Sequence, residues 1–268
     1  MKLCDRLNAC MMDGGDDAKM QRLTPDQYPA IAHVIRDETE FPSVSQYYQR
    51  KGGEFWVDRL PDPAVVIGLL PKDTFVWGDL SAPGASELLA RAKGLVADAP
   101  GLEPLLMQVW GRFTPLPSVE YRYHGVPYHQ RPLPEGFRLI AVGPEHLDLL
   151  CQYRPAYRTG TIGDFLSYDD FFANGFGFAV MDEAAGKIVS ACMAHAVSAK
   201  RVDHALRTLK GYEGKGLATA CVYATIMEGV RRGLDPVWIT EVDNHGSRSI
   251  VEKIGLRLNA QYVLFDRD

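Results

Sequence analysis

The sequence predicts an α/β protein with a mixed sheet, built as two halves. Short apolar runs bounded by turn residues alternate along the chain with amphipathic stretches, as strands and helices do. The length of 268 residues is enough for two ordinary domains, and the 46% of hydrophobic residues can fill their cores. Residues 119–135, rich in proline and tyrosine, divide two series of such runs. They predict a linker whose aromatic residues pack on a neighbour.

The first half, residues 20–118, is predicted to be an N-terminal α/β domain. Residues 1–19 precede it without a periodic pattern, so we expect a flexible leader there. Thr24 and Pro25 are typical of the first positions of a helix, which should run on to Glu38. The other predicted elements are strands at 64–70 and 74–80, a helix at 84–101 and a strand at 105–111.

The second half, residues 136–268, is predicted to be a mixed α/β domain with a longer series of elements. We expect strands at 137–142, 176–183, 188–199, 201–209, 236–242 and 256–266, and helices at 143–153, within 159–175, at 216–233 and at 247–255. The first half shows a fainter form of the same order. An internal duplication is therefore a hypothesis, although no residue-level repeat accompanies it.

Composition excludes several classes of protein. The net charge of -5 argues against a nucleic-acid binder, which usually carries a basic face. The sequence holds no 18-residue apolar run and no signal-peptide pattern, so we expect no membrane partner. Five scattered cysteines without a CxxC pair favour a reducing cytoplasm over a disulfide framework or a zinc site. The expectation is a cytoplasmic protein without a bound metal.

The stretch LKGYEGKGLATA, residues 209–220, is the first candidate for chemistry. Gly211, Gly214 and Gly216 fall within six positions, between a predicted strand and a predicted helix. Glycines let backbone N–H groups approach an anion, and a helix N-terminus favours negative charge. Neither the P-loop spacing nor GxGxxG is present. The alternative is an ordinary surface loop before a helix.

This turn resembles the pyrophosphate-binding turn of the GNAT superfamily, the acyl-CoA-dependent N-acyltransferases, whose signature is Gln/Arg-x-x-Gly-x-Gly/Ala. A second family motif follows in VWITEVDNHGSRSIVEKIGL, residues 237–256. It matches at Asn244, Ser247, Ser249, Glu252, Lys253 and Gly255. The resemblance covers about residues 135–268 and implies a GNAT-like C-terminal domain. The N-terminal domain is then expected to be a degenerate GNAT-like half without a cofactor turn, which helps to wall the acceptor site.

The resemblance implies acetyl-CoA as the acyl donor. It places the cofactor-binding residues at Leu206, Arg207, Leu209, Glu213, Gly214, Lys215, Gly216, Leu217, Ala218, Thr219, Asn244, Ser247 and Ser249. Two departures weaken the expected affinity. Gly211 stands where the family has Gln or Arg, and Glu213 stands where Arg is common. Lys215 offers partial compensation.

The implied reaction is direct attack of a neutral amine on the thioester. Asp203 aligns with a carboxylate that is the general base in several relatives, and a backbone N–H near Arg207 would serve the carbonyl oxygen. His204 is the other catalytic candidate, on the opposite face of the strand. If the hairpin turns tightly, His195 should lie near His204, either as a base site or as a half-buried sheet residue. The alternative for Asp203 is a solvated residue at a hairpin end.

Two further points concern the thiolate and the acceptor. The tyrosine that protonates the thiolate in many relatives is replaced by Val251, so water, Tyr223 or Tyr262 would have to serve. Arg154 and Arg158 could bind a carboxylate on the acceptor. The predicted function is acetyl transfer to a primary amine of a small molecule, with a homodimer left open. Acylation of a protein or peptide amine, or a non-catalytic acyl-CoA sensor, are the alternatives.

Overall fold

The computed structural model describes residues 20–36, 41–92, 94–97, 101–125, 128–154, 156 and 160–267. The predicted leader, residues 1–19, lies outside them. No helix within these ranges is both long and apolar enough to cross a membrane.

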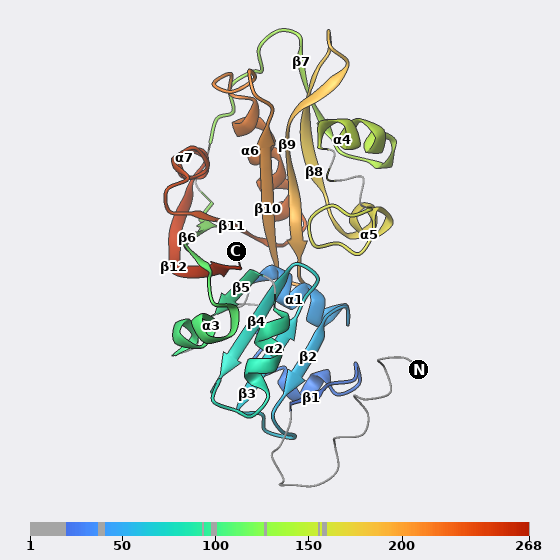
Figure 1. The fold of residues 1–268 in the computed structure, drawn as a ribbon. Helices are drawn as coiled ribbons and strands as arrows, with labels where there is room; N and C mark the ends of the chain where they lie inside the picture. The colour runs from blue at the N-terminus through green and yellow to red at the C-terminus, as the bar shows by residue number, and fades with distance from the viewer. Residues whose placement is uncertain are drawn as a thin grey trace, which may run out of the picture.

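One mixed sheet runs through both halves of the chain (Figure 1). Its strands are β1 (Gln21–Arg22), β2 (Glu54–Val57), β3 (Val65–Leu69), β4 (Asp73–Gly78), β5 (Gly94–Ala97), β6 (Thr114–Tyr123), β7 (Phe137–Ala141), β8 (Gly177–Asp182), β9 (Lys187–Val197), β10 (Arg201–Thr208), β11 (Asp235–Glu241) and β12 (Leu256–Asp266). Their order across the sheet is β1-β2-β3-β4-β5-β12-β6-β11-β10-β9-β8-β7. The α/β class with a mixed sheet is confirmed.

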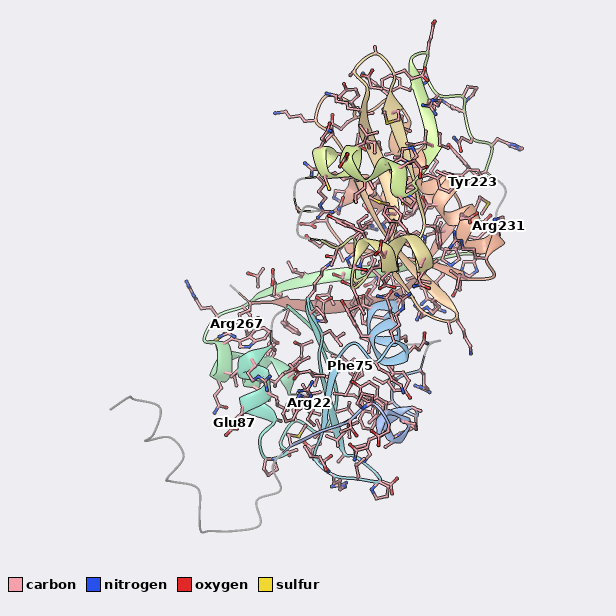
Figure 2. The ribbon with its side chains drawn as sticks, turned by 90° about the vertical axis from the view of Figure 1, so that its right-hand side faces the viewer. Arg22, Phe75, Glu87, Tyr223, Arg231 and Arg267 are labelled. Carbon is pink, nitrogen blue, oxygen red and sulfur yellow. The ribbon has the colours of Figure 1, made fainter. Side chains whose placement is uncertain are left out.

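This order has an internal two-fold symmetry. If each of β1 to β6 is replaced by its counterpart among β7 to β12 (β1 by β7, β2 by β8, and so on) and each of β7 to β12 by its counterpart among β1 to β6, the strand order becomes its own reverse. The two parallel pairs, β4 with β5 and β10 with β11, correspond under this exchange. Each half also places its last strand inside the other half, since β12 lies between β5 and β6 and β6 lies between β12 and β11. Figure 2 shows these two strands side by side across the middle, between Phe75 and Tyr223. The topology therefore supports the duplication hypothesis.

Helices cover both faces of the sheet in each half. They are η2 (Tyr28–Ile31), α1 (Pro42–Gln49), α2 (Ala85–Arg91), α3 (Leu102–Trp110), η3 (Pro144–His146), α4 (Leu147–Tyr153), α5 (Tyr168–Asn174), α6 (Leu217–Arg231) and α7 (His245–Lys253). Along β9, Ala191 and Met193 pack in the core beneath α4 and α5. Val189 and Cys192 pack on the other face, beneath α6 and α7. Alternation along β9, shifted at Val189 by a β-bulge against β8, thus builds two cores in the C-terminal half.

The helices and strands of the C-terminal half agree with the prediction, but three predicted elements of the N-terminal half are wrong. The helix from Thr24 is only the short 3-10 helix η2, because Pro29 lacks an N–H and its ring obstructs a longer helix. The predicted helix 84–101 ends at Arg91, where Ala92 turns extended, and β5 follows. The predicted strand 105–111 lies in α3, because a short apolar run does not by itself distinguish a strand from a buried helix.

The predicted linker is wrong at its start, because residues 119–123 are the second half of β6. The prolines Pro115 and Pro117 within β6 are unusual in a strand, so the sequence did not predict one here. Pro115 and Pro117 pair with β12, beyond the residues 118–122 that pair with β11, and within the described residues only the Pro117 carbonyl is bonded on the β11 side, to the Val242 N–H. At that point β6 is effectively an edge strand, where a missing N–H is tolerated.

Side chains of α1 join the two halves. Gln46 Nε2 donates to the Asp164 carbonyl at 2.7 Å, and its Oε1 accepts from the Val197 N–H at 2.7 Å. Arg50 pairs with Asp170 at 2.8 Å. Gln46 is buried, so these hydrogen bonds are shielded from water. The N-terminal half is thereby fixed against α5, the segment before it and the end of β9.

A buried ion pair anchors the exchanged strand β6. Arg201 is 1% exposed, and its Nη2 lies 3.3 Å from Glu120 Oε2. We expect Arg201→Met to lower the free energy of unfolding by about 1–3 kcal/mol, because Glu120 Oε2 loses its cation while Oε1 keeps Arg122 and Asn259. Urea denaturation measures this. Adding Glu120→Gln should restore part of the loss, and a double variant less stable than the sum of the singles would contradict the assignment.

Candidate active site

The site lies where β10 and β11 separate. The two strands pair in parallel from Arg201 with Asp235 to Asp203 with Val237, and not beyond. A β-bulge interrupts the pairing of β10 with β9 between Asp203 and His204. The strands then diverge, and a cleft of about 1100 Å³ opens between them.

The cleft is lined by His195 of β9 and by four segments that are far apart in sequence. They are β10 from Asp203 to Thr208, the glycine turn with the start of α6 from Tyr212 to Ala220, residues from Trp238 to Lys253 of β11 and α7, and residues 128 and 130–134. The last segment belongs to the predicted linker. Its aromatic residue Tyr128 stacks edge-on against Tyr223, with ring centroids 5.1 Å apart. The expectation that this stretch packs on a neighbour is confirmed.

The glycine turn is open toward the cleft. Gly216 has φ of 79° and caps α6, and Gly214 has φ of 75°, a left-handed backbone that favours glycine. A Cβ at either position would meet no atom within 4 Å. The first bond inside α6 runs from the Ala220 N–H to the Gly216 carbonyl, which leaves the three preceding N–H groups free for an anion.

The N-terminal half has a closed version of this turn. Gly84 caps α2 with φ of 84°, as Gly216 caps α6. A Cβ on Gly84 would lie 3.3 Å from both Cγ and the backbone nitrogen of Met20. Met20 is itself buried, so the chain fills this position with its own residue. The open turn of the C-terminal half has the room that a ligand needs.

The charges around the cleft are mostly positive. Arg131, Arg207, Lys215 and Lys253 line it, against the carboxylates of Glu213 and Asp203. Lys215 Nζ lies 5.1 Å from the centre of the Tyr212 ring, which holds the ammonium beside the turn. The Gly211 N–H donates to Glu213 Oε2 at 2.6 Å, so this side chain folds back on the turn. The cations fit a ligand with several phosphate charges.

Most residues predicted to bind the cofactor line this cleft. Those that do are Leu206, Arg207, Glu213, Gly214, Lys215, Gly216, Leu217, Ala218, Thr219, Asn244 and Ser247. Leu209 and Ser249 do not. Leu209 packs against the cores of the C-terminal half, and Ser249 lies on the exposed side of α7, about 200° around the helix from Ser247. Asn244 caps α7, where its Oδ1 accepts from the Ser247 N–H at 3.1 Å.

On β10, the backbone N–H groups that point toward the gap between β10 and β11 belong to the two neighbours of Arg207, Leu206 and Thr208. The Leu209 N–H donates to the Val189 carbonyl of β9 at 2.8 Å. Since N–H directions alternate along a strand, Arg207 also faces β9, while Leu206 and Thr208 face the edge that β11 leaves. The donor for a carbonyl oxygen is therefore expected from Leu206 or Thr208 rather than Arg207.

His204 is buried and uncharged. Burial lowers its pKa to about 4, and its Nδ1 lies 2.9 Å from the Val237 carbonyl. The ring stacks on Trp238 at 6.1 Å with an interplanar angle of 14°. The imidazole thus bridges β10 and β11 just where they separate.

His195 lies beside Asp203, and the prediction that it lies near His204 is wrong. Asp203 pairs with Ala196 and His204 pairs with Ala194, so His195 is the extra residue of the bulge, on β9. Its Nδ1 is 3.7 Å from Asp203 Oδ2 and 3.5 Å from Asp164 Oδ2. The Asp203 side chain is 13% exposed, which excludes the solvated hairpin-end alternative, and its burial raises its pKa to about 8.

His195 and Asp203 belong to a cluster of four charged or titratable side chains, and the sequence analysis did not predict the other two, Asp164 and Lys72. Asp164 precedes α5 and its side chain is 0% exposed. Lys72, in the turn between β3 and β4 of the N-terminal half, lies 3.4 Å from Asp164 Oδ1 and donates to the Gly163 carbonyl. No motif marks either residue. The contact joins positions 92 residues apart and depends on how the halves dock.

A second hollow of about 330 Å³ adjoins the first. Its lining includes Lys72, Arg154 and Thr161, and it shares His195 and Ala205 with the larger cleft. Arg154, predicted to meet the acceptor, is in this lining, whereas Arg158 lies outside the described residues. The predicted thiolate donors do not line either hollow: Tyr223 lies on α6 (Figure 2), and the Tyr262 hydroxyl is buried. Val251 is core.

Comparison with known proteins agrees with this geometry. The chain matches the family described as GNAT acetyltransferase over residues 32–265, and it belongs to that family. The match begins within the N-terminal half, so the family likeness extends well beyond residues 135–268. A Bacillus subtilis protein described as the uncharacterized N-acetyltransferase YdfB is 28% identical over 99 residues, which cover only 37% of each chain.

Solved structures share the fold over nearly the whole chain. A GCN5-related N-acetyltransferase-like protein from Streptococcus suis superposes with a TM-score of 0.71 and 19% identity, covering 91% of this chain and 99% of that one. A Drosophila protein gives a TM-score of 0.67 with 12% identity, covering 95% and 99%. A tandem GNAT protein from the clavulanic acid biosynthesis pathway gives 0.58 with 14% identity, covering 92% and 98%. At these identities the likeness concerns the fold alone.

Proposed function

We propose that this member of the GNAT acetyltransferase family transfers the acetyl group of acetyl-CoA to a primary amine of a small molecule. One observation carries the proposal. The open glycine turn and the free N–H groups of α6 lie in the same cleft as the separated edge of β10 and the pair of Asp203 and His195. An anion site and a proton acceptor are thus joined by one continuous hollow.

Each part of the cleft has a stated task. The N–H groups of Leu217 to Thr219 and the side chain of Lys215 hold the pyrophosphate, and acetyl-CoA supplies the reactive thioester. The N–H of Leu206 or Thr208 donates to the carbonyl oxygen as negative charge develops there. The pair of Asp203 and His195 takes the proton of the attacking amine.

The smaller hollow favours a small acceptor over a protein. Its volume of about 330 Å³ is at the lower end of the range of small-molecule pockets. Lys72 of the N-terminal half forms part of its wall, which supports the role proposed for that half. Thiol release from acetyl-CoA across a panel of small amines and N-terminal peptides tests this choice. Binding of acetyl-CoA without turnover on any of them would favour the sensor alternative.

Acetyl-CoA is expected to stabilise the protein. At about 100 times its dissociation constant it should add about 2.7 kcal/mol to the free energy of unfolding. This corresponds to a rise in melting temperature of about 5–10 °C. Differential scanning fluorimetry with acetyl-CoA, CoA and adenosine gives the comparison. No shift at millimolar acetyl-CoA would contradict the proposed function, although not the family.

Glu213→Gln is expected to tighten acetyl-CoA binding by about 3-fold to 10-fold. The change removes a negative charge from the phosphate turn, while the amide oxygen can still accept from the Gly211 N–H. The gain should shrink at high salt, since the carboxylate is exposed. Isothermal titration measures the affinity. Glu87→Gln, which makes the same charge change on α2 of the other half (Figure 2), should leave affinity unchanged.

A further inference from the structure

Two buried carboxyl groups, those of Asp164 and Asp203, lie beside one nitrogen of His195 and are called the acidic clamp below. Asp164 Oδ2 and Asp203 Oδ2 lie 3.5 and 3.7 Å from the same ring atom, Nδ1. Three of the four oxygens of these carboxyl groups have no hydrogen-bond partner in the described part of the chain. Lys72, 3.4 Å from Asp164 Oδ1, approaches from the N-terminal half. Such a concentration of unsatisfied acceptors is costly unless the group they face carries a proton toward them.

The clamp selects one tautomer of the neutral ring. A proton on Nδ1 faces oxygens of both carboxyl groups, whereas a lone pair there would face the negative charge of Asp164, and also that of Asp203 above its pKa of about 8. Nε2 is therefore the nitrogen that keeps its lone pair. The side chain is 31% exposed, so the ring is accessible although the carboxylates are shielded.

His195 also stands at the junction of the two hollows. It lines the large cleft, where the thioester is proposed to bind, and the smaller hollow, where the acceptor is proposed to bind. Ala205, on the neighbouring strand β10, is the other residue that lines both hollows. A molecule in the smaller hollow meets acetyl-CoA beside this ring.

We propose that Nε2 of His195 is the base that accepts the proton of the attacking amine, and that Asp164 and Asp203 are positioning residues that hold its Nδ1–H. The inference rests on the proposed function and deepens it. In the step, the amine nitrogen bonds to the acetyl carbon, the carbon–sulfur bond breaks, and one N–H proton moves to Nε2. The departing thiolate needs one proton, so the imidazolium can return it and no further donor is required for balance.

The pKa values of His195 and Asp203 are shifted in opposite directions, so the pH dependence of turnover distinguishes His195 from Asp203 as the base. Burial lowers the pKa of His195, Asp164 raises it, and the cations of Lys72 and Arg154 lower it, with a net decrease from its ordinary value of about 6.5. The pKa of Asp203 is raised to about 8. With His195 as base, turnover should rise with pH through a limb below about 6.5 and be level near pH 8. With Asp203 as base, the limb lies near pH 8.

The pH experiment uses the unmodified protein with acetyl-CoA and methoxyamine, a weakly basic acceptor that stays unprotonated across the range. Thiol release is followed at saturating acetyl-CoA. An acid limb below about pH 6.5 supports His195, and a limb near pH 8 overturns the assignment in favour of Asp203. Absence of any turnover with methoxyamine or the amine panel counts against the proposed function, which the tautomer measurement below does not require.

Variants give the second test. His195→Gln should lower kcat by about 10²-fold to 10³-fold with acetyl-CoA affinity unchanged, and added imidazole should restore part of the turnover of His195→Ala. Asp203→Asn and Asp164→Asn should each cost about tenfold, because one carboxylate still holds Nδ1–H, and imidazole should rescue neither. The double variant should fall to the level of His195→Gln. Loss of turnover in Asp203→Asn alone, with His195→Gln keeping more than a tenth, overturns the proposal.

The tautomer can be read without turnover. Nitrogen-15 NMR of the full chain labelled at histidine distinguishes a protonated Nδ1 from a protonated Nε2, with His195→Gln assigning the signal. A proton on Nδ1 at pH 7.5 in the parent, lost in favour of Nε2 in the double variant, supports the clamp. A proton on Nε2 of His195 in the parent overturns it, and this readout needs only His195→Gln, which assigns the signal, to fold.

Discussion

Gly216→Glu is expected to weaken acetyl-CoA binding by at least about 100-fold, which corresponds to about 2.7 kcal/mol. The residue caps α6 with φ of 79°, and a Cβ there enters open space rather than protein. A glutamate would bring its bulk and charge to the helix end where the phosphates are proposed to bind. The left-handed backbone also costs any non-glycine residue about 1–2 kcal/mol, so the apo protein should melt a few degrees earlier.

Gly233→Glu is the matched control for this effect. Gly233 has φ of 76° and an equally open Cβ position, but it follows the other end of α6 and does not line the cleft. It should lose similar apo stability and keep acetyl-CoA affinity within a few-fold. Melting of the apo variants together with titration of acetyl-CoA separates strain from obstruction. Equal affinities for Gly216→Glu and the parent would remove the phosphate role from this turn.

The binding half of the site was predictable because its determinants are local. A strand, three glycines and a helix follow one another in residues 201–231, and the backbone angles at Gly214 and Gly216 are those that glycine favours. Phosphate recognition by backbone N–H groups needs little from elsewhere in the chain. The neighbouring motif after β11 adds Asn244 and Ser247 in the same way.

The proton-accepting half depends on contacts that sequence spacing does not encode. The bulge after Asp203 decides which histidine faces it, and bulges carry no reliable sequence mark. Lys72 and Asp164 meet only because the two halves dock through α1. The pattern of alternation alone therefore placed His195 beside the wrong neighbour.

The fold was less predictable where the two halves exchange strands. Alternation, turns and capping glycines indicated most elements of the C-terminal half correctly. They could not show that β6, encoded before residue 124, completes the sheet of the second half. Pairing across the middle of the sheet is set by packing between distant segments, so a boundary drawn from composition divided a strand.

Because β6 of the N-terminal half lies between β11 and β12 of the C-terminal half, we expect that residues 136–268 will not fold by themselves. This fragment lacks β6, and so Val119 and Tyr121, both nearly fully buried, and the Glu120 partner of Arg201 are missing. Burial of each large apolar side chain contributes about 1.5–3 kcal/mol. Together with the loss of Glu120 beside the buried Arg201 and of the ladders on both sides of β6, the deficit approaches the whole stability of about 5–15 kcal/mol. Circular dichroism should show no cooperative melting.

A rearranged chain supplies the control, because Asp266 at the end of β12 pairs with Thr114 at the start of β6. Joining residues 112–125 directly after residue 268 would connect the two strands by a short hairpin and return β6 to its place. We expect this chain to melt cooperatively and to bind acetyl-CoA more weakly than the parent, since it keeps most of the cleft but lacks residues 128 and 130–134 of its lining, Arg131 among them. Cooperative melting of residues 136–268 alone would show that the second half is complete without the exchanged strand. Failure of the rearranged chain would instead mean that the α1 hydrogen bonds to Asp164 and Val197 are also required for folding.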